Sequence, residues 1–91
     1  MKQIVVLNPR DNVATSLSAL AEGASVAAEG IALTVTGDIP FAHKLAIRAI
    51  APGAEVVKYG EVIGLASCSI APGDWVHVHN VESARARGDL T

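Results

Sequence analysis

The sequence predicts a mostly-β fold, a single small domain of short strands joined by Pro-Gly corners. One pattern occurs three times, at 20–26, 50–56 and 70–76: an aliphatic residue, Ala, any residue, Gly, two more residues and Val. Over 31–36, large apolar residues alternate with smaller ones, which is typical of a half-buried strand. Phe, Trp and Tyr occur once each among 91 residues, so the core must use small aliphatic side chains in thin layers.

The corners are predicted from a proline followed by a glycine in two of the three copies, Pro52-Gly53 and Pro72-Gly73. Proline fixes φ near −65° and glycine readily takes positive φ, a combination that favours a type II turn. Each copy therefore predicts strand, tight turn, strand. The spacing between copies is irregular, which argues against a stacked solenoid.

The remaining strands are predicted from apolar runs between turn residues, at 4–7, 43–50, 55–59, 62–66 and 75–79. The segment 13–22 is ambiguous. Asp11 and Asn12 could cap a helix there, whereas the other two copies of the repeat have extended chain before their corners. We predict a strand followed by a single helical turn.

Size and composition bound the function. We expect one domain over 1–81 and a flexible or partner-packing tail over 82–91. The formal charge of −2, with both signs mixed, argues against a nucleic-acid partner. The single Cys68 cannot form an internal disulfide, and no apolar run is long enough for a membrane span or a signal peptide. These features predict a soluble cytoplasmic protein with no membrane partner.

The three histidines are the first candidates for chemistry. His77 and His79 are two apart, so on a strand they would share one face with Trp75. Two imidazoles on one face can share a metal ion or bind a carboxylate. A metal would need a third ligand, for which His43 and Asp74 are the candidates. The alternative is a polar, solvent-facing side of a strand whose valines fill the core.

Two further groups carry anion-binding chemistry. His43 and Lys44 follow a proline-bearing turn and could hold an anion, or form a surface pair at a strand start. Lys58 supplies a cation, Tyr59 a hydroxyl donor, and Gly60 a backbone that a ligand can approach closely. The alternative for this second group is a hairpin end with a solvated lysine.

Two single residues complete the candidates. Asn80 closes the last predicted strand, where its amide could bind a substrate hydroxyl or turn the chain. Cys68 lies in a run of small residues with no base beside it, so we expect a small buried side chain and not a nucleophile. No catalytic residue is assigned.

Several of these motifs, taken in order, resemble one known family. The segments concerned are Asp11-Asn12-Val13-Ala14, His43-Lys44, Lys58-Tyr59-Gly60, Ile63-Gly64 and His77-Val78-His79-Asn80. Together they resemble the small N-terminal domain of altronate and galactarate dehydratases, and the small subunit of sulfolactate sulfo-lyase looks like the same domain. The resemblance implies a β-clip fold of the SAF type. Family members usually have glycine before His-Lys, where this chain has Ala42, so a need for positive φ there would shift His43.

The resemblance also implies a function. It implies a lyase that removes water or sulfite from a hydroxylated acid, with a divalent metal, often iron, in the full enzyme. A much larger catalytic partner carries most of the machinery, so the chain alone is expected to be inactive. The implied substrate-binding residues are His43, Lys44, Lys58, Tyr59, Gly60 and Asn80, and the implied metal ligands, or further substrate ligands, are His77 and His79.

Two other functions fit the same residues. The domain could be a stand-alone anion- or carbohydrate-binding SAF module with no catalytic partner. It could also serve only in assembly, with exposed valine and isoleucine on sheet edges buried against a partner or a second copy in a homo-oligomer.

Overall fold

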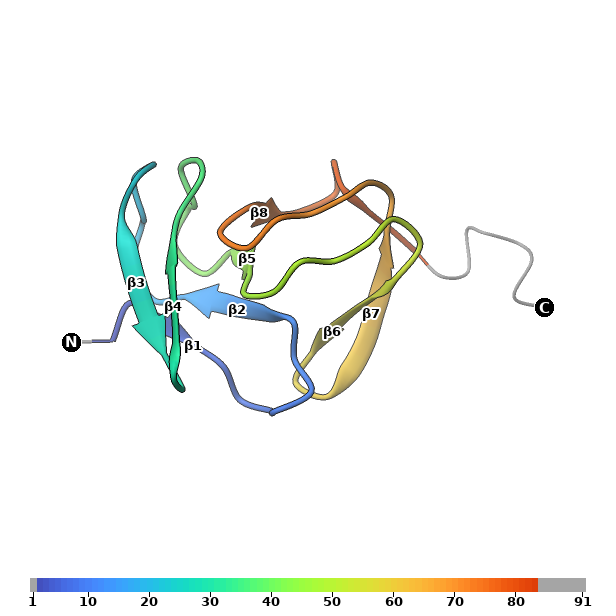
Figure 1. Ribbon diagram of the computed structural model, residues 1–91, viewed down its shortest axis with the longest axis horizontal. Helices are drawn as coiled ribbons and strands as arrows, with labels where there is room; N and C mark the ends of the chain where they lie inside the picture. The colour runs from blue at the N-terminus through green and yellow to red at the C-terminus, as the bar shows by residue number, and fades with distance from the viewer. Residues whose placement is uncertain (1, 84–91) are drawn as a thin grey trace.

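The computed structural model describes residues 2–83, which are built of strands alone (Figure 1). The strands are β1 (Ile4–Val5), β2 (Val13–Ser16), β3 (Ser25–Ala28), β4 (Ile31–Thr34), β5 (Lys44–Ala46), β6 (Glu55–Lys58), β7 (Glu61–Ala66), β8 (Trp75–Val76) and β9 (Val81–Glu82). The predicted mostly-β fold class is confirmed. In this part of the chain no helix is long and apolar enough to cross a membrane.

The strands form three layers (Figure 1). A central antiparallel sheet has the order β1-β2-β5-β8, the β3–β4 hairpin lies against one face, and the β6-β7-β9 sheet lies against the other. Ala14 and Leu45 pack in a core with the β3–β4 hairpin, whereas Val13 and Ala46 pack in a second core with the β6–β7 hairpin. Neighbouring residues of a strand point to opposite faces, so β2 and β5 serve both cores.

All three predicted corners are type II turns. Gly23, Gly53 and Gly73 take φ of 88°, 83° and 93° at the third position of their turns. In each turn the amide of the fourth residue donates to the carbonyl of the first, at distances of 2.9 or 3.0 Å. The local Pro-Gly chemistry therefore predicted these corners correctly.

A fourth corner, Pro40 to His43, was missed. Ala42 has φ of 68°, and the His43 amide donates to the Pro40 carbonyl at 3.1 Å, as in the other three turns. The pattern was hidden because alanine stands in the glycine position. The position does require positive φ, and Ala42 adopts it, so His43 keeps the same place in its corner as the fourth residues of the other turns. The expected shift of His43 is not seen.

Replacing Ala42 with glycine should stabilise the fold by roughly 0.5–1 kcal/mol. A left-handed conformation costs an L-residue about 1–2 kcal/mol, and the extra freedom of glycine in the unfolded chain returns about 0.5–1 kcal/mol. The midpoint of urea unfolding measures the change. Ala51 opens the turn that contains Gly53 and has no positive φ, so Ala51→Gly should lower the midpoint. A midpoint lowered equally by both substitutions would contradict the argument.

The two halves of the domain repeat one another. Leu20 bridges Ile39 with two backbone hydrogen bonds of 2.8 Å, and Ile50 bridges Ile70 with bonds of 2.8 and 2.9 Å. The second pair follows the first by 30 and 31 residues. The additional residue matches a bulge at Val56/Val57 in the β6–β7 hairpin. The three sequence copies are thus parts of an internal duplication with two corners and one hairpin in each half.

Both hairpins turn on two residues of positive φ, the type I′ geometry that matches the twist of paired strands. Glu29 and Gly30 have φ of 52° and 78°, and Tyr59 and Gly60 have φ of 57° and 75°. The predicted break at Gly60-Glu61 is therefore wrong by one residue, since Glu61 begins β7.

Three further predictions are corrected. The strand in 13–22 is present as β2, but no helical turn follows it. The predicted strand over 75–79 is wrong, because β8 ends at Val76. Cys68 is exposed and not buried. Of the predicted tail, Glu82 belongs to β9, and 84–91 lie outside the described residues.

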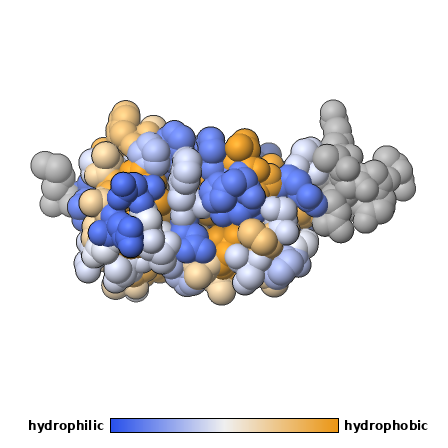
Figure 2. Space-filling model, turned by 90° about the horizontal axis from the view of Figure 1, so that it is seen from above, coloured by the Kyte–Doolittle hydropathy of each residue, from blue (hydrophilic) through white to orange (hydrophobic). Residues whose placement is uncertain are grey.

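The surface exposes apolar side chains at scattered positions. Seen from above, apolar patches lie among hydrophilic side chains (Figure 2). The large exposed apolar residues are Leu7, Leu17, Phe41, Tyr59, Val62, Ile63 and Val78. Ile63 and Val78 belong to the groove described next.

Candidate functional site

A groove of about 430 Å³ brings three of the predicted site residues together. Lys44 comes from the start of β5, Lys58 from the end of β6, and His77 from the segment after β8. The rest of the lining is apolar or comes from the end of the described chain: Ile63, Val78, Val81, Glu82 and Ser83. The site thus has an apolar wall and a cationic edge.

Two like charges face this groove. Burial, and secondly the charge of Lys58, lower the pKa of Lys44 from its ordinary value. The ammonium of Lys58 also lies 4.8 Å from the centre of the Tyr59 ring, within cation–π range. Glu82 brings one carboxylate to the lining, so the two lysines outnumber it. An anion bound between the lysines would relieve their repulsion.

All three histidines gather around Trp75. The His77 ring stacks on the indole with centroids 5.0 Å apart and planes 8° apart, and His79 lies 5.2 Å away in a tilted arrangement. His43 lies 5.7 Å from Trp75 and 5.0 Å from His77. The predicted neighbourhood of Trp75, His77 and His79 is confirmed, although a turn and not a strand creates it.

Asn80 shapes the turn that follows β8. Its Oδ1 accepts a hydrogen bond from the His77 amide at 2.9 Å, and its Nδ2 donates to the Trp75 carbonyl at 2.8 Å. The Asn80 amide donates to the His77 carbonyl at 3.2 Å. The side chain is buried, and both of its polar atoms are engaged. Asn80 therefore holds the segment that presents the histidines.

Asp11 and Asn12 hold the hairpin that carries Lys58, a role that sequence reasoning missed. Asp11 is buried, and its Oδ1 accepts from the Gly60 amide at 2.8 Å. Asn12 accepts from the Val57 amide and donates to the Glu55 carbonyl, each at 2.8 Å. The signal available was their place at the head of the motif set, where the sequence alone suggested helix caps.

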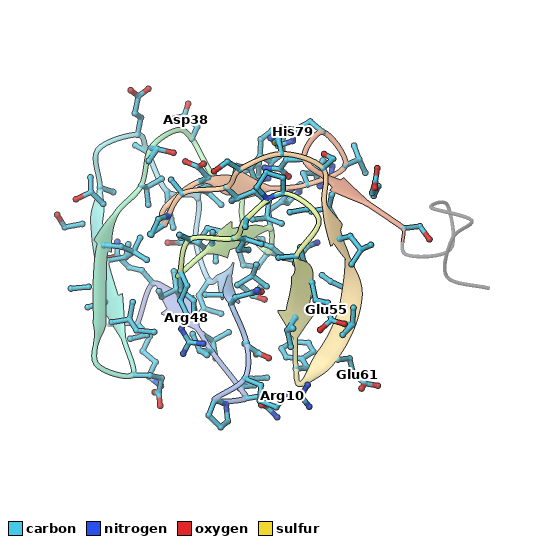
Figure 3. All side chains as sticks on the ribbon, turned by 45° about the vertical axis from the view of Figure 1, so that its right-hand side comes forward. Arg10, Asp38, Arg48, Glu55, Glu61 and His79 are labelled. Carbon is cyan, nitrogen blue, oxygen red and sulfur yellow. The ribbon has the colours of Figure 1, made fainter. Side chains whose placement is uncertain are left out.

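The other predicted residues do not share the groove. Gly60 approaches Asn8 closely, because a β-carbon there would lie 2.7 Å from the Asn8 amide nitrogen. Its close approach is therefore to its own chain. His79 and Glu61, the residue after Gly60, lie at opposite ends of the molecule in Figure 3. A single rim that includes Tyr59 and both imidazoles is not formed, and the groove of Lys44, Lys58 and His77 is the common place.

Comparison with known proteins identifies the domain. Residues 2–84 match the family described as the altronate/galactarate dehydratase SAF domain. The chain belongs to this SAF domain family. Both resemblances stated from the motifs are confirmed, because the relatives include altronate dehydratases and a sulfolactate sulfo-lyase subunit.

Three relatives show how the SAF domain occurs in longer proteins. Altronate dehydratase of Escherichia coli K12 is 42% identical over 81 residues, which cover 89% of this chain and 16% of that protein. Altronate dehydratase of Bacillus subtilis 168 is 36% identical over 83 residues, 91% of this chain and 17% of that protein. The (2R)-sulfolactate sulfo-lyase subunit alpha of Chromohalobacter salexigens is 51% identical over 47 residues, 52% of this chain and 50% of that protein. The chain spans about one sixth of the altronate dehydratases.

The donor set of this SAF domain does not make a metal centre by itself. Within residues 2–83, no group of three or more His, Cys, Asp and Glu is placed to hold a metal ion. The three imidazoles surround an indole ring instead. A metal at His77 and His79 stays a prediction, and it would require ligands from outside the described range.

Proposed function

We propose that this SAF domain is the small subunit, or small domain, of a lyase that acts on a hydroxy acid. Its groove binds the carboxylate of the acid between Lys44 and Lys58. The observation that carries this proposal is the meeting of these two cations and His77 in one partly apolar groove. The small share of the altronate dehydratases that the chain spans supports a larger catalytic portion outside it.

The chemistry explains why cations are useful there. In the elimination of water, a base removes the proton next to the carboxylate, and the hydroxyl on the neighbouring carbon leaves with a proton as water. Before the leaving group departs, the electron pair of the broken C–H bond adds negative charge to the carboxylate. Two fixed ammonium groups stabilise that additional charge more than they stabilise the ground state. The base, the acid and the divalent metal, with iron as the expected ion, are assigned to the larger portion.

The remaining predicted residues take supporting roles in this proposal. Tyr59 keeps the Lys58 ammonium near its ring, and its hydroxyl is free to meet the hydroxylated part of the acid. His77 contributes a polar group to the groove. Asn80 acts through the turn it closes.

A sulfo-lyase function is the second candidate. The sulfolactate sulfo-lyase relative has the highest identity of the three, although over a shorter segment, and it is named as a subunit. Its substrate name also denotes a hydroxy acid, so the same carboxylate site would serve. In that case the group that leaves is sulfite in place of water.

Reconstitution tests the proposal. The chain is co-purified with the large dehydratase or sulfo-lyase subunit of its source, and turnover of altronate, galactarate and sulfolactate is measured. We expect no turnover by the chain alone and turnover by the complex with one of these acids. Saturable calorimetric binding of an acid by a chain that joins no larger protein would instead support a stand-alone binding module.

A further inference from the structure

A hydrogen bond between Trp75 and His43 sets the position of the His43 proton. The Trp75 Nε1 lies 3.2 Å from the His43 Nδ1. An indole N–H only donates, so the Nδ1 must accept with its lone pair. In a neutral imidazole whose Nδ1 accepts, the proton is on Nε2. The bond therefore assigns the Nε2–H tautomer to His43.

His43 is held on several sides. Its amide donates to the Ser16 hydroxyl at 3.2 Å, and that hydroxyl donates to the Pro40 carbonyl at 2.7 Å. The ring packs 5.0 Å from His77, which lines the groove. The corner and the two aromatic neighbours thus fix both the backbone and the ring plane of His43.

The other ring nitrogen is available to a ligand. Within residues 2–83, the Nε2 of His43 has no hydrogen-bond partner, since its side chain bonds only to Trp75. The buried polar side-chain atoms that lack a partner are the Asp11 Oδ2 and the Thr15 Oγ1. The His43 Nε2 is not among them, so it reaches the surface beside His77.

We propose that His43 presents its Nε2–H as a fixed hydrogen-bond donor to an oxygen of the acidic substrate, and that Trp75 is the positioning residue that sets this donor. The inference rests on the proposed function for the identity of the acceptor, a carboxylate or hydroxyl oxygen. A protonated Nε2 has no lone pair in the ring plane, so it neither removes a proton nor binds a metal. His43 is therefore a donor, and not the third metal ligand that the sequence suggested as a candidate.

Nitrogen NMR of the uniformly ¹⁵N-labelled full chain tests the tautomer without any substrate. Long-range ¹H–¹⁵N spectra should show His43 with its proton on Nε2. In Trp75→Phe, which keeps an aromatic ring and removes the donor, the two His43 nitrogens should move toward the shifts of a mixed tautomer. His79 also contacts the indole but has no hydrogen bond to it, so its tautomer serves as the internal control. A proton on the His43 Nδ1, or no change in Trp75→Phe, overturns the assignment.

Kinetics of the complex with the larger subunit test the donor role. Loss of one hydrogen bond to a charged acceptor corresponds to about a tenfold increase in KM. His43→Gln places a side-chain N–H near the position of Nε2, whereas His43→Asn places it near Nδ1. We expect Gln to keep KM within a few-fold of wild type and Asn to raise it about tenfold. Equal KM for both variants overturns the donor role.

The two proposals fail separately. If the Nε2–H tautomer is found but replacement of both groove lysines leaves KM unchanged, the carboxylate site is wrong and the Trp75–His43 assignment stands. If the lysine replacements raise KM but His43 carries its proton on Nδ1, only the donor inference is wrong. Urea unfolding of Trp75→Phe and both His43 variants shows whether a loss comes from misfolding.

Discussion

Replacement of Gly73 with alanine should lower the free energy of unfolding by about 3 kcal/mol or more, a large part of the stability of a small domain. A β-carbon at this position would overlap the backbone carbonyl oxygen of Thr34 and lie 3.1 Å from its carbon. The Gly73 carbonyl also accepts a hydrogen bond from the Thr36 amide at 3.1 Å. The end of β4 and this corner therefore cannot separate without losing that bond. The positive φ of 93° adds a further cost for alanine.

Gly53→Ala is the matched control. Gly53 occupies the same position of an equivalent corner with φ of 83°, but a β-carbon added there would meet nothing within 4 Å. Only the left-handed backbone is penalised, so the expected loss is about 1 kcal/mol. Urea unfolding followed by circular dichroism gives both values. Equal losses in the two variants would show that contact with Thr34 is not the cause.

The corners could be predicted because their chemistry is local. Proline before glycine predicts a turn wherever it occurs, and both copies with this pair form one. The corner at Ala42 has no such signal, because alanine rarely adopts positive φ. It becomes recognisable only when Ile39 is seen paired with Leu20 as Ile70 is paired with Ile50.

The site was predicted in part for the same reason. Lys44 and Lys58 were identified from motifs, but their meeting depends on the pairing of distant strands. Ala14 and Ala28 stand 30 residues before these lysines, in the corresponding places of the first half. The duplication therefore gives both halves one scaffold, and only the second half carries the cations. Contacts over long sequence separations, such as Asp11 with Gly60, leave no periodic signal in the sequence.

Replacing both groove lysines with methionine should weaken binding of the hydroxy acid by about a hundredfold, since a charge-assisted hydrogen bond contributes about 1.5–3 kcal/mol. Methionine keeps most of the unbranched stem and removes only the charge. The KM of the complex with the larger subunit, or calorimetric titration of the acid, measures the effect. Lys2→Met is the control, because Lys2 is the third lysine of the chain and lies outside the groove. Equal affinity in wild type and the Lys44/Lys58 double variant would exclude the groove as the carboxylate site.

The pH dependence separates the contributions of the two lysines. Burial first, and the charge of Lys58 second, lower the pKa of Lys44, so Lys44 loses its proton at lower pH than a solvent-exposed lysine does. Binding needs the charged form and should therefore fall as pH rises through this lowered pKa. Lys58→Met removes the second cause, raises the pKa of Lys44 and moves the fall in affinity to higher pH. A fall in affinity that stays at the same pH in Lys58→Met would mean that the Lys44 charge does not hold the acid.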